Sequence, residues 1–210
     1  MNLSESDKIR RASFGTNQLS FLDRFGIWLS RRAIIKQVGN RGELSVLELG
    51  CGYSARNLLT IEDRATKLVG VDFNLSTEVK NHPKFVPLEY PAVEALERLR
   101  GQKFDLIMII SVLEHLDNPV DILQSCRMLL NPRGVLLVNV PTWLGKIFLE
   151  FSAFRLGLSP KEEMDDHKMY YDKRDLWPVL VKSGFLPSNI NMYYHKFHLN
   201  LFASVKVDSL

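Results

Sequence analysis

The chain has 210 residues, of which 46% are hydrophobic and 24% are charged, and its formal net charge is +3. These values are ordinary for a globular protein, so we expect residues 1–210 to form a single domain. They exclude a disordered chain, and a cysteine count of two (Cys51 and Cys126) excludes a disulfide framework. No basic run reaches five residues, which argues against a nucleic-acid partner.

The first 142 residues predict an amino-terminal helix followed by alternating strands and helices. Residues 1–40 form a helical cover, with apolar side chains at helical spacing over 17–38. In the core segment 43–142, short apolar runs predict strands and amphipathic runs predict helices. The expected strands are 44–49, 67–71, 85–88, 104–110 and 135–140, and the expected helices are 55–61, 92–100 and 119–130. This alternation is typical of an α/β fold with a doubly wound, mostly parallel sheet.

The last third of the chain begins with an unusually apolar insert at 143–167, which carries Trp143, Phe148 and several leucines. A helix is expected over 172–183, with Gly184 as its stop. Residues 189–207 contain two strand-like runs around His195–His198. The insert follows the strand 135–140, so we expect it at the ligand-facing edge of the sheet, as a lid over the core.

Two glycines one residue apart, Gly50 and Gly52, follow the buried strand 44–49 and precede a helix. Glycine is needed there because the backbone turns sharply and a ligand approaches closer than a Cβ would allow. The next strand ends in a lone carboxylate, Asp72, twenty residues after Gly52. In such units the carboxylate accepts hydrogen bonds from the two hydroxyls of a ribose. The pattern therefore predicts a ligand that carries a nucleoside.

The glycines alone fit either a dinucleotide or another nucleoside ligand. Glu48 stands at the end of the first strand, where a negative charge suits the cationic amino-acid end of a sulfonium cofactor better than a pyrophosphate. The chain is also short for a dinucleotide fold with a catalytic module. It holds no Tyr-x-x-x-Lys pair, the signature of compact reductases. These three features favour a sulfonium cofactor over NAD.

Four stretches taken in order resemble the motif series of class I S-adenosylmethionine-dependent methyltransferases. They are Glu48-Leu-Gly-Cys-Gly52, Val71-Asp-Phe73, Phe104 to His115, and Leu130-Asn-Pro-Arg-Gly-Val-Leu136. The resemblance covers residues 43–142 well, although Ser54 replaces the third glycine that the family often has. It implies a seven-stranded sheet in which 189–207 forms a closing hairpin with one antiparallel strand. It also implies S-adenosylmethionine as the cofactor.

The expected cofactor site is drawn from the ends of the strands and from the glycine loop. By resemblance, Asp72 holds the ribose hydroxyls, Phe73 lies against the adenine and Glu89 lies near the adenine amino group. Glu89 also fits a solvated loop glutamate. Because ligands bind outside the carboxyl ends of parallel strands, Ser111 joins this set. The predicted cofactor-binding residues are Glu48, Gly50, Gly52, Asp72, Phe73, Glu89 and Ser111.

The candidate catalytic residues are His115 and His167, because a base is needed where the acceptor is a hydroxyl or a protonated amine. His115 follows the central strand, and His167 lies where the insert returns to the core; an imidazole changes protonation near neutral pH. The alternative for His115 is that it braces the next helix. Asp165, Asp166 and His167 are consecutive and cannot all face one ion from regular structure, so no metal site is expected.

The predicted activity is methyl transfer from S-adenosylmethionine to oxygen or nitrogen of a small-molecule or carrier-linked acceptor. Two alternatives stay open: a cofactor-binding partner protein without chemistry, and an NAD-dependent oxidoreductase. The segment 143–161 has two further interpretations, a peripheral contact with a membrane or lipid-linked acceptor and a homodimer interface, so monomer and homodimer both fit. No membrane-spanning run and no signal-peptide core are present, and the expected location is the cytoplasm.

Overall fold

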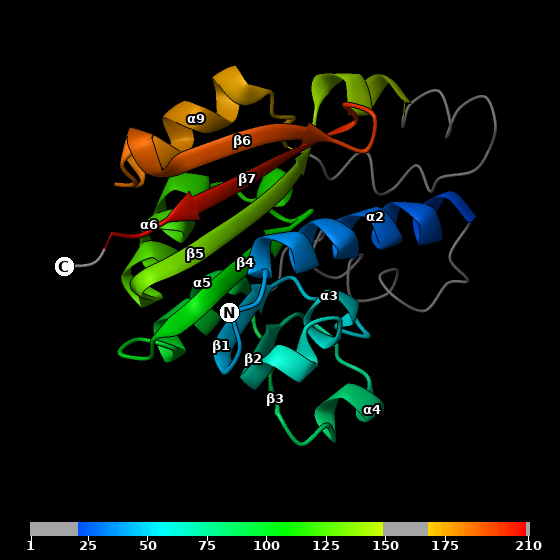
Figure 1. The fold of residues 1–210 in the computed structure, drawn as a ribbon, viewed down its shortest axis with the longest axis vertical. Helices are drawn as coiled ribbons and strands as arrows, with labels where there is room; N and C mark the ends of the chain where they lie inside the picture. Colours follow the sequence, from blue (N-terminus) through cyan, green and yellow to red (C-terminus); the bar gives the residue numbers. More distant parts are fainter. Residues whose placement is uncertain (1–20, 149–167, 209–210) are drawn as a thin grey trace. The chain divides into compact units, whose positions relative to one another are not determined.

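The computed structural model describes residues 21–148 and 168–208. Seven strands share one sheet in the order β3-β2-β1-β4-β5-β7-β6, drawn as arrows in Figure 1. The pairs β1–β2, β2–β3 and β4–β5 are parallel, while β7 runs antiparallel to β5 and to β6. The expected mostly parallel sheet and its antiparallel closing hairpin are therefore confirmed. The chain divides into two compact units, 1–100 and 101–210, and the single-domain organisation stays a prediction.

The first unit is a three-stranded parallel sheet with short helices between the strands. Leu49 at the end of β1 lies beside Val71 at the end of β2, and Val71 lies beside Leu88 at the end of β3. The three strands therefore end level with one another. Functional side chains that follow these strands are thus brought to one edge. The elements are α2 (Phe21–Val38), β1 (Leu44–Leu49), α3 (Arg56–Leu59), η1 (Glu62–Arg64), β2 (Ala65–Val71), α4 (Thr77–Lys80), β3 (Phe85–Leu88) and α5 (Ala92–Arg98).

The core of this unit is closed by a contact that depends on a glycine in β2. A Cβ on Gly70 would lie 2.3 Å from Cζ of Phe85 and 2.9 Å from Sγ of Cys51. The Phe85 ring and the Cys51 side chain, both buried, therefore occupy the space that any side chain at position 70 would need. The absence of a side chain at Gly70 lets β3 and the glycine loop pack onto β2.

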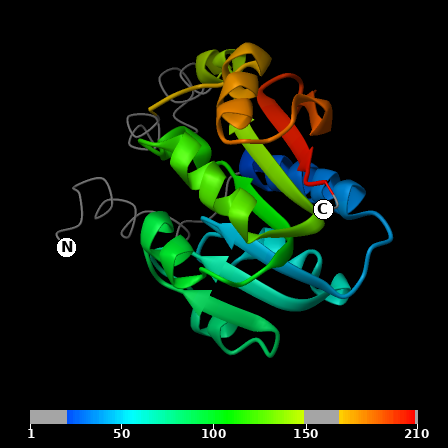
Figure 2. The same cartoon turned by 90° about the vertical axis from the view of Figure 1, so that its left-hand side faces the viewer.

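The second unit joins the parallel pair β4–β5 to the antiparallel hairpin β6–β7. All residues of β4 are buried except Asp105, as expected of a strand covered on both faces. Helices α6 and α9 pack against each other. In Figure 1 α9 lies at the upper edge next to β6, and Figure 2 shows the helices from another side. The elements are β4 (Phe104–Ile110), η2 (Leu113–His115), α6 (Pro119–Leu129), β5 (Leu130–Pro141), α9 (Lys173–Lys182), η3 (Pro187–Asn189), β6 (Ile190–His195) and β7 (Asn200–Lys206).

Several predicted boundaries were wrong in detail. The helix expected over 55–61 is the single turn α3, because a 3-10 turn at Glu62–Arg64 leads directly into β2. Asn118, a residue type that often caps helices, precedes α6, but its side chain makes no capping hydrogen bond. His198 lies in the hairpin turn between β6 and β7, with φ of 68°. Of the apolar insert, only 143–148 is described, as a helical segment.

Candidate functional site

The glycine loop is a tight turn that leaves β1 and enters α3. Gly50 and Gly52 have φ of 67° and 73°, in the left-handed region that favours glycine. The amides of Gly50 and Cys51 both donate to the carbonyl of Val71, at 2.8 and 3.0 Å. The loop is therefore fastened to the end of β2. A Cβ built on Gly52 would meet no atom within 4 Å, so this glycine faces open space.

Asp72 is the first residue after β2, and its carboxylate is held by two backbone amides. Oδ2 accepts from the Gly52 amide at 2.7 Å, and Oδ1 accepts from the Phe73 amide at 2.8 Å. Its own amide donates to the carbonyl of Leu88 at the end of β3. A carboxylate oxygen can accept more than one hydrogen bond, and Asp72 is partly exposed. A partly exposed, oriented carboxylate of this kind can accept two hydroxyl donors.

Glu48 lies beneath the loop and is fully buried. Its Oε1 accepts from Nδ2 of Asn57 on α3 at 2.9 Å, and its Oε2 has no hydrogen-bond partner in the part of the chain that the structure describes. Burial raises the pKa of Glu48 to about 8, with the hydrogen bond from Asn57 opposing this and the charge of Asp72 adding to it. Glu48 is therefore mostly protonated at neutral pH.

Cys51, between the two glycines, does not have the properties of a nucleophile. It is buried, and burial raises its pKa well above the usual value, with Glu48 and Asp72 acting in the same direction. The thiol stays protonated, whereas the thiolate is the reactive form. Cys51 instead fills the space beside Gly70. The sequence offered no signal for this packing role, nor for the contact between Asn57 and Glu48.

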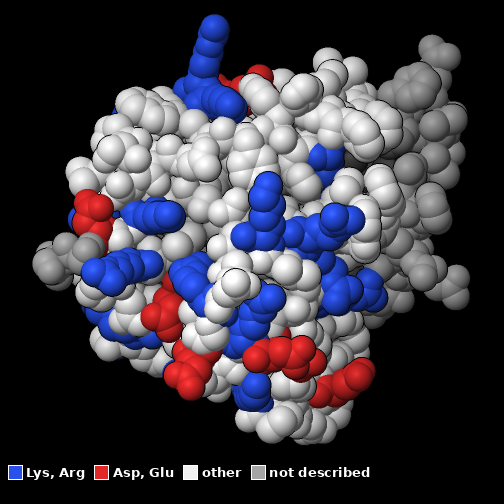
Figure 3. Space-filling model, viewed as in Figure 1, with Lys and Arg blue, Asp and Glu red and all other residues white. Residues whose placement is uncertain are grey.

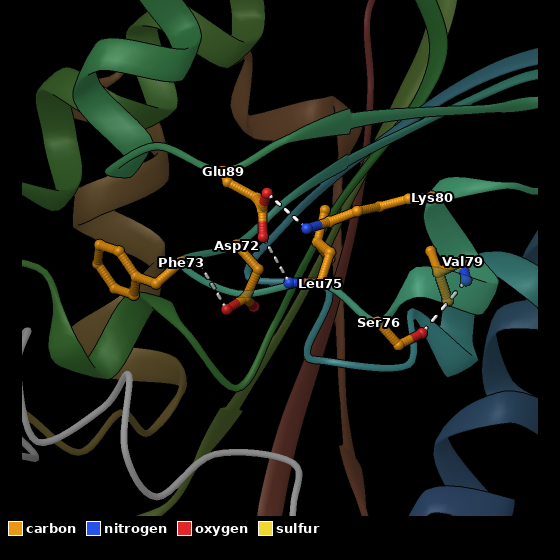
Figure 4. Close-up of polar contacts among 7 residues, drawn as sticks. All are labelled: Asp72, Phe73, Leu75, Ser76, Val79, Lys80 and Glu89. Atoms are coloured by element: carbon orange, nitrogen blue, oxygen red, sulfur yellow. Dashed lines mark hydrogen bonds and ion pairs between the residues drawn. The ribbon is translucent and has the colours of Figure 1, made fainter.

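Glu89 follows β3 and braces the segment after β2, as Figure 4 shows. Its Oε1 accepts from the Leu75 amide at 2.9 Å, and its Oε2 pairs with Nζ of Lys80 at 2.7 Å. Phe73 lies at the start of the same segment and is partly exposed. Glu89 thereby holds the backbone that carries Phe73 next to Asp72. Its predicted contact with an adenine amino group stays a prediction.

In the second unit, Ser111 follows β4 at the carboxyl end of the parallel pair. It is exposed and has φ of 55°, which is uncommon for a residue other than glycine. Its amide donates to the carbonyl of Asn139 on β5 at 2.8 Å. Backbone strain of this kind is typical of functional positions. The geometry thus agrees with the choice of Ser111 as a candidate, and its contact with a cofactor stays a prediction.

His115 ends the 3-10 turn η2 and is half-buried. Its neighbour Glu114 is buried, and the Glu114 carbonyl accepts from the amides of Lys168 and Met169 at 2.9 and 3.3 Å. These bonds hold the segment after the insert against η2. Tyr171 in that segment is also buried, and burial raises its pKa to about 12, with Glu114 and Asp175 adding to the effect. Tyr171 is one of the two tyrosines after His167 that the sequence suggested could shape an acceptor site.

A hollow of about 500 Å³ opens next to Leu116, the residue after His115, between the loop that precedes α6, α6 itself, α9 and the segment after the insert. Asp117 and Lys168 form an ion pair in its wall, and the other described lining residues are mostly apolar. It is lined by Leu116, Asp117, Pro119, Lys168, Met169, Tyr171, Asp175, Pro178, Val179 and Lys182. Its position next to η2 makes it a candidate acceptor pocket within this unit.

The second catalytic candidate, His167, lies outside the described residues. Over 21–148 and 168–208, no cluster of three His, Cys, Asp or Glu side chains is arranged to hold a metal ion. Within the same ranges, no helix combines the length and the apolar character that crossing a bilayer requires.

The sheet order, the glycine turn and the carboxylate after β2 define the class I methyltransferase fold, a Rossmann-like architecture. A family model described as a methyltransferase domain matches residues 19–186. The chain therefore belongs to the family of class I S-adenosylmethionine-dependent methyltransferases. The resemblance based on four motifs is thus confirmed, and membership of this family argues against the NAD-dependent alternative.

Two of the curated relatives that the chain matches are both named ubiquinone biosynthesis O-methyltransferase. The ubiquinone biosynthesis O-methyltransferase of Histophilus somni is 34% identical over 134 residues, which are 59% of this chain and 55% of the relative. The mitochondrial ubiquinone biosynthesis O-methyltransferase of Saccharomyces cerevisiae is 31% identical over 139 residues, or 60% of this chain and 44% of the relative. The chain thus spans about half the length of the curated relatives that it matches.

Solved structures share the fold over nearly the whole chain. The N-methyltransferase NodS of Bradyrhizobium japonicum, in complex with S-adenosylhomocysteine, superimposes with a TM-score of 0.64 at 13% identity, covering 97% of this chain and 99% of its own. The magnesium protoporphyrin IX methyltransferase of Synechocystis, also with S-adenosylhomocysteine bound, gives 0.63 at 19% identity, covering 96% and 94%. These likenesses support the fold.

Proposed function

We propose that this chain transfers a methyl group from S-adenosylmethionine to a hydroxyl or amine of a small-molecule acceptor. The observation that carries the proposal is the Gly50–Gly52 turn, whose amide orients the carboxylate of Asp72 at 2.7 Å. When bound, the cofactor supplies an activated methyl group on a sulfonium. The chain then has to orient the acceptor and exclude water, and it needs little covalent chemistry of its own.

The residues of the first unit fit such a cofactor on three structural grounds. The open space over Gly52 admits a ligand close to the backbone, and Asp72 accepts the two ribose hydroxyls. Glu48 has a buried oxygen, Oε2, without a hydrogen-bond partner among the described residues. A cationic ligand group next to this oxygen would favour the ionised form of Glu48. In this proposal Phe73 stacks against the adenine, on the segment that Glu89 braces through the Leu75 amide.

We propose further that the methyl group is transferred to an oxygen atom, and that the acceptor is an apolar molecule with a ring. The names of the two curated relatives support this choice, as do the apolar side chains that line part of the hollow next to Leu116. In this proposal His115 takes the hydroxyl proton as general base. The exposed side chains of Trp143, Leu144, Ile147 and Phe148 extend the apolar surface available to a lipid-linked or carrier-linked acceptor.

The test is a titration with S-adenosylhomocysteine and NADH, followed by a methyl-transfer assay with catechols of increasing alkyl length. We expect binding of S-adenosylhomocysteine alone and turnover that rises with alkyl length. His115→Ala should lower the maximal rate and flatten the acid limb of its pH profile. Binding without turnover on any hydroxyl or amine would favour the cofactor-binding partner instead. An unchanged profile in His115→Ala would assign His115 to bracing.

A further inference from the structure

The helix α2 has two different long faces, of which one packs into the first unit. Its described side chains are those of residues 25–38. Ser30, Ala33, Ile34 and Val38 are buried. At 100° per residue they lie within one sector of the helix, which is the face expected to cover the core.

The opposite sector of α2 is apolar as well as basic. Phe25, Trp28 and Ile35 expose 41%, 47% and 41% of their surface, and the cations Arg31, Arg32 and Lys36 are exposed among them. The rings of Phe25 and Trp28 stack at 5.7 Å, and the Arg32 guanidinium lies 4.9 Å from the Trp28 ring centre. These six residues form the outer face of α2.

The charge of this face has one sign. From 25 to 38 the sequence holds three cations and no acid. Figure 3 has the viewpoint of Figure 1 and shows Lys and Arg in the area where Figure 1 draws α2. Arg31 also donates to the hydroxyl of Thr60 at the end of α3, which fixes one cation at the border of the face.

A helix on the surface of a globular protein normally presents polar groups outwards, and one that is apolar on both sides is covered by something else. Aromatic and aliphatic side chains interleaved with cations are the pattern of helices that lie in the plane of a membrane interface. There the apolar groups enter the acyl boundary, and Arg and Lys meet anionic headgroups. We infer that the outer face of α2 docks the protein on an anionic lipid surface.

The composition of the outer face of α2 favours a lipid surface over two other partners, a nucleic acid and a protein. A nucleic acid could bind through the cations and through base stacking on Trp28, but an exposed Ile35 would contribute little to its binding. A protein partner would leave Arg31, Arg32 and Lys36 to be paired by acids, and a bilayer of anionic lipid supplies such charge continuously. The inference goes beyond methyl transfer, because it concerns where the protein sits and involves no contact with the cofactor.

The experiment is co-sedimentation of the full chain with vesicles of phosphatidylcholine alone or of phosphatidylcholine with phosphatidylglycerol. We expect binding to the anionic vesicles only, weakening with added salt. Arg32→Gln/Lys36→Gln should lower the partition coefficient at least about tenfold, since each cation near an anionic surface contributes about fivefold. The matched control Arg100→Gln/Arg127→Gln removes two exposed cations carried elsewhere and should bind like the parent.

The fluorescence of Trp28 gives a second readout. The chain has three tryptophans, so the other two have to be replaced. In Trp143→Phe/Trp177→Phe, Trp28 is the sole tryptophan, and its emission should shift to the blue and be quenched by brominated lipid. A matched reporter with Trp143 alone tests the helical segment 143–148. Quenching of Trp143 without Trp28 would overturn the inference, as would equal binding by the Arg32/Lys36 variant. Binding to RNA with none to vesicles would also overturn it.

Discussion

At the scale of single residues, the site combines a partly exposed carboxylate with a fully buried one. Asp72 is partly exposed and held by two amides, whereas Glu48 is fully buried with a pKa of about 8. The sequence alone pointed to both acids because each stands at the end of an apolar strand. It could not show that one of them is neutral, since burial depends on α3 and on Asn57 covering it.

The raised pKa of Glu48 predicts how stability depends on pH. Between the usual value of 4.5 and about 8, the folded chain keeps a proton that the unfolded chain has lost. The free energy of unfolding contributed by this group therefore falls as pH rises through that window. Glu48→Gln removes the titration and keeps the amide acceptor for Asn57. Its stability relative to the parent, from chemical unfolding, should rise between about pH 5 and about pH 8.

Other titrating groups cancel in this comparison, because both proteins contain them. A difference in unfolding free energy that stays constant across the pH window would mean that Glu48 has an ordinary pKa in the folded protein. The control Glu97→Gln changes an exposed glutamate on α5 and should give such a constant difference.

At the scale of elements, the glycine in β2 decides how β3 and the glycine loop pack. Gly70→Ala would push the Phe85 ring and Cys51 away from β2. We expect a loss of about 1–3 kcal/mol of stability, typical of overpacking in a core. The matched control is Gly42→Ala, where a Cβ meets no atom within 4 Å. Thermal unfolding should separate the two variants, and Phe85→Leu should partly restore Gly70→Ala. Equal melting temperatures for Gly70→Ala and Gly42→Ala would contradict this packing.

The strands of the core were predictable because each is an apolar run between turn residues. Their ends moved by at most two residues, except that β5 begins at Leu130, five residues before the predicted start. The short helices were harder, since α3 is a single turn whose length is set by the 3-10 turn after it. Local propensity also favoured Asn118 as a cap, yet its side chain does not bond to the helix. The clash at position 70 involves residues far apart in sequence, so no local pattern reveals it.

At the scale of the whole molecule, cofactor and acceptor functions should be separable. Trp143 is half-exposed and donates to Asp175 at the start of α9, and Phe148 is exposed in the same helical segment. Trp143→Ser/Phe148→Ser should keep the affinity for S-adenosylhomocysteine within about threefold, because the cofactor motifs lie at strand ends. Methyl transfer should fall about a hundredfold, as expected when an acceptor is misplaced by about 1 Å.

Titration and a transfer assay on the same preparation would check this separation. Loss of cofactor affinity in the double variant would make the segment a cover over the donor, and the acceptor site would then have to be sought elsewhere. The hollow next to Leu116 would then carry the acceptor without this segment.

The central claim is that the carboxylate after β2 binds the nucleoside of the cofactor. The most direct measurement is the dissociation constant of S-adenosylhomocysteine for the parent, for Asp72→Asn and for the control Asp63→Asn, an exposed aspartate of the same unit. Loss of charge-assisted hydrogen bonds worth about 1.5–3 kcal/mol predicts at least about tenfold weaker binding by Asp72→Asn. The control should match the parent. Parent-like affinity in a folded Asp72→Asn would contradict the claim.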